Sequence, residues 1–234
     1  MTKSKRGPVL LILFAALMAG AGNGISIVAF PWLVLQRNGS AFDASLVAMA
    51  GTLPLLASTL IAGTAVDYIG RRRVSMISDA LSALAVAAVP IIAIAFGADA
   101  VNAGVLAALA ALGSLFDPAG ITARESMLPE AAKRAGWTLD HSNSVYEAVF
   151  NLAYIVGPGI GGLLIATLGG INTMWVTTSA FVLSILAISV LRLEGAGRPD
   201  HTRCPRAAWC GRASWRASAS SGTTRCCAPW RSST

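Results

Sequence analysis

Residues 148–191 read AVFNLAYIVGPGIGGLLIATLGGINTMWVTTSAFVLSILAISVL and contain no Asp, Glu, Lys or Arg. A helix needs about 20 predominantly apolar residues to cross the hydrocarbon core of a bilayer, so this charge-free run holds two spans. A second charge-free run, residues 7–36, holds one more. Only 12% of the 234 residues are charged, whereas soluble domains carry about 25%. A soluble globular enzyme is therefore excluded, and the fold class is an all-α polytopic membrane protein.

The apolar runs and the turn residues between them predict six transmembrane helices. They lie at about 9–36, 44–68, 74–96, 101–123, 142–168 and 171–192, and the longest connection is expected at 124–140. Lys and Arg gather on one side of these spans, at Lys3, Lys5, Arg6, Arg71, Arg72, Arg73, Arg124, Lys133 and Arg134, against Arg37 alone on the other. Because cytoplasmic loops carry the excess of positive charge, we expect a multi-pass protein of the cell (inner or plasma) membrane with both termini in the cytoplasm. The basic residues flank the spans and form no nucleic-acid-binding patch.

The composition changes after residue 198. Residues 199–234 contain no Leu, Ile, Val, Phe or Met but hold all four cysteines, at Cys204, Cys210, Cys226 and Cys227. A segment without aliphatic residues cannot form a core, so disorder is expected. The cysteines lack paired C-x₂-C spacing, and no metal site is predicted. This composition is typical of GC-rich coding sequence read out of frame. We therefore divide the chain into a six-helix bundle, 1–198, and a frame-shifted tail, 199–234.

The loop between the second and third spans carries a motif, Gly63-Thr-Ala-Val-Asp67-Tyr-Ile-Gly70-Arg71-Arg72-Arg73. Gly63 is expected to allow close helix approach and Gly70 a tight reversal. Asp67 can form a charge-assisted bond with one of the arginines, and Asp79 is expected to pair with the same loop. The motif matches every fixed position of G-x-x-x-D-x-x-G-R-[RK]-[RK], so the chain resembles the major facilitator superfamily.

A second motif, Gly157-Pro158-Gly159-Ile160-Gly161-Gly162, lies in the fifth predicted span. Small residues at this density allow helices to touch without intervening side chains, which is common in any membrane bundle. The motif is also similar to the G-P-x-x-G-G element of the superfamily's drug:proton antiporters. Phe116 to Arg124, Leu128-Pro129 and Asn143 resemble the macrolide and siderophore exporter branch. The resemblance covers about residues 9–192, the N-terminal half of a twelve-helix family, and none is found in 199–234.

Polar residues inside spans are costly, so each is a candidate site residue. Asp117 lies late in the fourth predicted span, where we expect a capping or gating role. Glu147 and Asn151 share one helix face at i,i+4 spacing; Glu147 is either solvated or a proton carrier. Asn23, in the first span, either bonds a neighbouring helix or contacts substrate. The family's arginine within the fourth helix is absent from 101–116, which weakens the case for proton coupling.

The resemblance implies export of small amphiphilic, drug-like molecules by proton-coupled alternating access. The first, fourth and fifth spans would line the cavity, and Asp67 with Arg71–Arg73 would form the cytoplasmic gate. No enzyme activity, cofactor or phosphate-binding loop is expected. A rocking mechanism needs two halves, so this chain would be a truncated half. It would then either pair with a second transporter half, or with itself, or be inactive. A non-transporting scaffold subunit is the remaining alternative.

Overall fold

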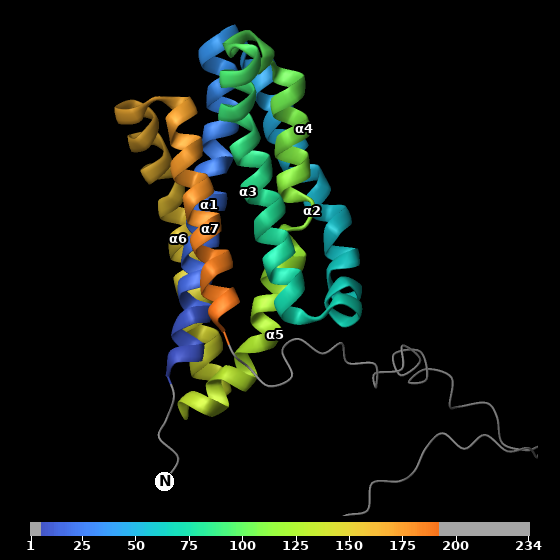
Figure 1. The fold of residues 1–234 in the computed structure, drawn as a ribbon, viewed down its shortest axis with the longest axis vertical. Helices are drawn as coiled ribbons and strands as arrows, with labels where there is room; N and C mark the ends of the chain where they lie inside the picture. The colour runs from blue at the N-terminus through green and yellow to red at the C-terminus, as the bar shows by residue number, and fades with distance from the viewer. Residues whose placement is uncertain (1–5, 192–234) are drawn as a thin grey trace, which may run out of the picture. The chain divides into compact units, whose positions relative to one another are not determined.

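The computed structural model describes residues 6–191, apart from the side chains of residues 60, 61 and 98. The described residues are helical almost throughout. The elements in chain order are α1 (Gly7–Asn38), α2 (Ala41–Ile69), α3 (Arg71–Phe96), the short 3₁₀ helix η1 (Ala98–Ala100), α4 (Ala103–Ser114), α5 (Asp117–Ala135), α6 (Leu139–Leu168) and α7 (Gly170–Val190). Figure 1 shows the long helices running side by side. The tail 199–234, with its four cysteines, lies outside the described residues.

Within residues 6–191, six helical stretches are long and apolar enough to cross a membrane. This confirms the predicted six-span architecture. Glycines with positive φ separate the long helices at Gly39, Gly70, Gly97, Gly136 and Gly169, a conformation that costs glycine no steric strain. Gly70, with φ +94°, makes the expected reversal between α2 and α3.

The fourth span differs from the prediction. It extends from Ala103 to Ala135 and consists of two helices, α4 and α5, interrupted at Leu115 and Phe116. The prediction ended this span at 123 because Arg124 and Glu125 follow, and it placed a long connection at 124–140. The predicted long connection is wrong, because α5 continues through the charged residues. Only residues 136–138 join α5 to α6.

The bundle is assembled around α1, which packs against both α6 and α7. The α1–α6 contact is the most extensive helix pair and is a backbone contact, because a Cβ added at Gly24 would lie 2.8 Å from the carbonyl oxygen of Tyr154. On the other side, α3 packs against α7, α4 and α5, while α2 packs against α4 and α5. The close packing of α1 on α6 holds these two helices together, and both contribute residues to the lining of a cavity.

Candidate functional site

A cavity of about 510 Å³ lies among the helices. Every long helix contributes to its lining, so the prediction that the first, fourth and fifth spans face it was incomplete. The lining residues are Asn23, Ser26, Ile27, Phe30 and Pro31 of α1, Val47, Ala48, Gly51, Thr52 and Leu55 of α2, Ser82, Ala85 and Val86 of α3, Ala110, Gly113 and Ser114 of α4, Asp117 and Ile121 of α5, Phe150, Asn151 and Tyr154 of α6, and Phe181 of α7. The surface is mostly apolar with a few polar groups, the usual character of small-molecule sites.

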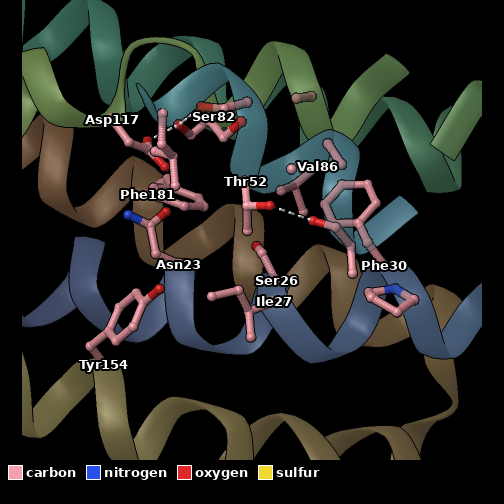
Figure 2. Close-up of a pocket in the computed structure, with 18 of the residues that line it drawn as sticks. Asn23, Ser26, Ile27, Phe30, Thr52, Ser82, Val86, Asp117, Tyr154 and Phe181 are labelled. Atoms are coloured by element: carbon pink, nitrogen blue, oxygen red, sulfur yellow. Dashed lines mark hydrogen bonds between the residues drawn. The ribbon is translucent and has the colours of Figure 1, made fainter. Parts of the chain in front are cut away.

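Asp117 lies on the cavity wall near the middle of the fourth span, in the first turn of α5. The expectation that it lies late in the fourth span is wrong, because the span continues for 18 residues beyond it, to Ala135. The hydroxyl of Ser82 lies 2.9 Å from Asp117 Oδ1 and 3.0 Å from the carbonyl oxygen of Gly113. Ser78 donates a hydrogen bond of 2.9 Å to the carbonyl oxygen of Phe116. Ser78 thus bonds the interruption in the fourth span, and Ser82 bonds groups on both sides of it; Figure 2 shows Ser82 beside Asp117.

Three other predicted residues have defined positions. Asn23 and Asn151 line the cavity from α1 and α6. Asn151 donates a hydrogen bond of 3.1 Å to Glu147, which confirms that the pair shares one helix face. Glu147 itself is exposed and does not line the cavity. The structure therefore brings Asn23, Asn151 and Asp117 together around one cavity and leaves Glu147 outside it.

A buried ion pair lies away from the cavity lining. Arg124 Nη1 is 2.9 Å from Asp79 Oδ1 and 3.0 Å from Oδ2, and both side chains are almost fully buried. The hydroxyl of Ser184 is 2.6 Å from Asp79 Oδ2 and 3.1 Å from the carbonyl oxygen of Ala15. The prediction that Asp79 pairs with the arginine loop is wrong. This cluster joins α3, α5, α7 and α1, and burying a charge at such a position requires a partner of this kind.

Arg124 was missed as a site residue because it was counted among the basic loop residues. One signal in the sequence could have revealed its role. Asp79 is the only ionisable residue in the third predicted span, 74–96. An acid buried at such a position needs a cation from another helix. Arg124, at the predicted end of the next span, is such a cation. Its Nε and the hydroxyl of Tyr146 are buried without a hydrogen-bond partner among the described residues.

Arg71–Arg73 were predicted in a loop, but they form the first turn of α3, and two of them bond other helices of the bundle. Arg71 Nη1 donates a hydrogen bond of 3.0 Å to the carbonyl oxygen of Ser126 in α5. Arg72 donates to the carbonyl oxygens of Ile188, at 3.2 Å, and Ser189, in the last turn of α7. A cation is favourable at this end of a helix, where carbonyl groups lack intrahelical partners.

Asp67 and Gly63 do not behave as expected. Asp67 is exposed and has no ion pair with any arginine within residues 6–191, so the predicted bond inside the loop is not formed. A Cβ added at Gly63 would meet nothing within 4 Å, so this glycine makes no close helix contact here and that expectation is wrong.

The motif from Gly157 to Gly162, which lies in α6, contains two kinds of glycine. A Cβ at Gly157 would lie 2.8 Å from Gly24 Cα, and one at Gly161 would lie 3.3 Å from Ile25 Cα, which confirms close packing on α1. A Cβ at Gly162 would meet nothing within 4 Å. Pro158 lies at the same crossing, 3.2 Å from a Cβ added at Gly24. The motif thus builds the α1–α6 contact through Gly157 and Gly161 but not through Gly162.

Comparisons with known proteins agree with this architecture. The family described as Major Facilitator Superfamily matches residues 12–222. The match extends beyond residue 198, so the expectation that no resemblance reaches the tail is wrong. The chain is 81% identical over 202 residues to the "Multidrug efflux pump Tap" of Mycolicibacterium fortuitum, covering 86% of this chain and 49% of the relative. It is 68% identical over 206 residues to proteins of the same name from Mycobacterium tuberculosis (strain ATCC 25618 / H37Rv) and Mycobacterium bovis (strain BCG / Pasteur 1173P2), covering 88% of this chain and 49% of each relative. The chain therefore spans about half the length of these curated relatives.

Proposed function

Because this chain belongs to the major facilitator superfamily, we propose that its six spans form one half of an exporter of small amphiphilic molecules. The observation that carries the proposal is the cavity of about 510 Å³ lined by side chains from all the long helices. Ligand sites of drug-sized molecules measure roughly 300–1,000 Å³ and are mainly apolar with a few placed polar groups. The name of the relatives, multidrug efflux pump, supports the same activity.

The proposed mechanism is alternating access, in which two helix bundles rock about a site between the membrane faces. In it, the segment from Gly63 to Arg73, which comprises the end of α2, Gly70 and the start of α3, acts as the cytoplasmic gate. Arg71 and Arg72 bond the start of α3 to α5 and α7, while Asp67 is exposed and free to contact a second bundle. Protons are the proposed coupling ion, with Asp117 and Glu147 as the candidate carriers. The excess of Lys and Arg at the N-terminus and in the connections after the second and fourth predicted spans supports a cytoplasmic N-terminus in the cell membrane.

The half-length match to the relatives favours a second possibility. Alternating access requires two bundles, so the six spans described here would act together with another transporter half or with a second copy of the chain. Alone, they would transport nothing. A scaffold role would be indicated if substitutions at Gly157, Pro158 or Gly161 impaired association of the chain with another subunit and left efflux unchanged.

The test is efflux from cells that express only this chain, measured as the rate at which preloaded ethidium fluorescence falls. Thr52 lines the cavity, so Thr52→Trp should fill part of it and slow efflux. Thr59→Trp is the matched control, because Thr59 is exposed on the same helix and does not line the cavity. Asp67→Asn tests the gate.

Three outcomes separate the alternatives. Efflux that is lost in Thr52→Trp and kept in Thr59→Trp supports transport through the cavity. Efflux equal to that of empty-vector cells for every variant contradicts transport by this chain alone. Its appearance on co-expression of the C-terminal half of a relative would then support the half-transporter.

A further inference from the structure

We propose that Asn23 and Ser26 form a hydrogen-bonding subsite in the cavity, which binds the polar head of an uncharged aromatic amphiphile. The head would carry a donor and an acceptor on neighbouring atoms, as a carboxamide does. The biological meaning of this subsite rests on the proposed function, but its binding of a ligand is tested separately from transport.

Two flanking glycines fix the face of α1 on which Asn23 lies. A Cβ added at Gly22 would lie 2.9 Å from the ring of Phe181 in α7, and one at Gly24 would lie 2.8 Å from the carbonyl oxygen of Tyr154 in α6. Helix α1 is therefore packed against a neighbouring helix on each side of Asn23. Because successive residues of an α-helix are turned by about 100°, Asn23 lies on a third face, and this face borders the cavity.

Ser26 lies on the same face of α1. It follows Asn23 by three residues, a spacing that places two side chains on one helix face, about 4.5 Å apart along the axis. Both residues line the cavity, and Figure 2 shows them projecting from the same side of α1. The hydroxyl oxygen of Ser26 is buried without a hydrogen-bond partner among the described residues, and Asn23 has none there either. The bond from Asn23 to a neighbouring helix, which the sequence allowed, is thus not formed within residues 6–191.

Other polar side chains of the cavity lining are bonded within the protein. Thr52 and Ser114 donate hydrogen bonds of 3.1 and 3.2 Å to carbonyl oxygens of their own helices. Asn151 donates a hydrogen bond of 3.1 Å to Glu147. The amide of Asn23, in contrast, keeps two N–H donors and an oxygen acceptor available. Polar groups inside a membrane need hydrogen-bond partners, and a ligand in the cavity can provide them.

The two unpaired groups determine the chemistry of the ligand head. A carboxamide oxygen can accept a hydrogen bond from one of them while the carboxamide N–H donates to the other, because both Asn and Ser donate and accept. Phe30 and Phe181 also line the cavity, and aromatic rings favour a flat aromatic body through stacking. A site built to bond a polar group rejects an analogue that lacks the group, since its own polar atoms are then left unpaired. The subsite therefore selects its ligand by hydrogen bonding and requires no charge on it.

The test is equilibrium binding to the full 234-residue chain in lipid nanodiscs, with protein-free nanodiscs as the lipid reference. The probes are radiolabelled pyrene-1-carboxamide and 1-isopropenylpyrene, which has a similar shape but no hydrogen-bonding group. Asn23→Leu and Ser26→Ala should each bind the carboxamide about 5- to 10-fold more weakly, the loss expected for one neutral hydrogen bond. Both variants should bind the isopropenyl probe at least as well as the wild-type chain does. Asn172→Leu is the matched control, at an exposed asparagine of α7 outside the cavity, and should leave both affinities unchanged.

Ser26→Ala removes a single oxygen atom, so it decides the question if Asn23→Leu fails to fold. Wild-type affinity for the carboxamide in Ser26→Ala, or in a folded Asn23→Leu, would overturn the subsite. So would an equal loss of both probes in Ser26→Ala, or no carboxamide binding by the wild-type chain. Carboxamide binding that depends on these two residues without any efflux would refute transport by this chain and leave the subsite intact. Efflux without such binding would do the reverse.

Discussion

The substitution Gly157→Ala tests the packing of α1 on α6. A Cβ at position 157 would lie 2.8 Å from Gly24 Cα, 3.0 Å from Gly24 C and 3.2 Å from the carbonyl oxygen of Ala21. All three are backbone atoms of α1, so no side chain can rotate away. Ordinary carbon contacts are about 3.5–4.0 Å, and the two helices would have to separate by about 1 Å along the most extensive contact of the bundle.

The expected cost follows from two opposing effects. Overpacking a well-filled contact costs about 1–3 kcal/mol, and the upper part of the range applies where only backbone can move. Alanine regains up to about 1 kcal/mol through its higher helix propensity. The net loss in the free energy of unfolding is therefore about 2 kcal/mol for Gly157→Ala. At Gly162 the added Cβ meets nothing within 4 Å, so Gly162→Ala should be neutral or slightly stabilising.

The measurement is denaturant unfolding of the purified chain in mild detergent, followed by tryptophan fluorescence and circular dichroism. Gly161→Ala gives an intermediate point, because its Cβ would lie 3.3 Å from Ile25 Cα and from the more adjustable Cγ2 of the same residue. We expect stability to decrease in the order Gly162→Ala, Gly161→Ala, Gly157→Ala. Equal stability of the first and last variants would show that α1 and α6 do not cross at the distance described here.

Three further predictions concern the ion pair, the arginine loop and the orientation. Arg124→Gln leaves Asp79 buried without its cation, so unfolding should become easier by about 3–5 kcal/mol; the double variant with Asp79→Asn should recover part of this loss, and wild-type stability of the single variant would contradict the pairing. Arg72→Ala removes the bonds to the last carbonyls of α7 and should lower the free energy of unfolding by about 1–2 kcal/mol. Arg73 is exposed, so Arg73→Ala should stay within about 0.5 kcal/mol of the wild-type chain in the same unfolding assay. In a background without the four native cysteines, Asn38→Cys should react with an impermeant maleimide in intact cells and Arg73→Cys only after permeabilisation; the opposite pattern would reverse the proposed orientation.

Local sequence features predicted much of this bundle. The charge-free runs predicted the spans, because the ability of a helix to cross a bilayer depends mainly on its length and its apolar composition. Gly70 predicted the reversal between α2 and α3, since a positive φ is a local property of the backbone. The Gly157 to Gly162 motif predicted a close helix contact but not which of its glycines make it. That distinction depends on the helix that packs opposite, which in this structure is α1 at Gly24 and Ile25.

The residues of the fourth span could not be placed from local features. Arg124 ended the predicted span because an unpaired charge is costly inside a membrane. The structure removes that cost with Asp79, a partner 45 positions earlier in the chain. Once α5 continues through Arg124, Asp117 moves from the end of the span to its middle. One long-range ion pair thus accounts for both errors, the position of the span boundary and the position of Asp117.

The same region explains how the cavity acid is held in place. Ser78 and Asp79 share one turn of α3 and Ser82 lies on the next; they bond the carbonyl oxygen of Phe116, the guanidinium of Arg124 and the side chain of Asp117. A Cβ added at Gly120 would lie 2.8 Å from Ser78 Cβ, so α5 runs unusually close to α3 between these bonds. Because α4 ends before Asp117, the direction of α5 is set by α3 and not by continuation of the preceding helix. The buried ion pair therefore has a role at a distance from the cavity: together with the two serines, it fixes the angle at which α5 places Asp117 on the cavity wall.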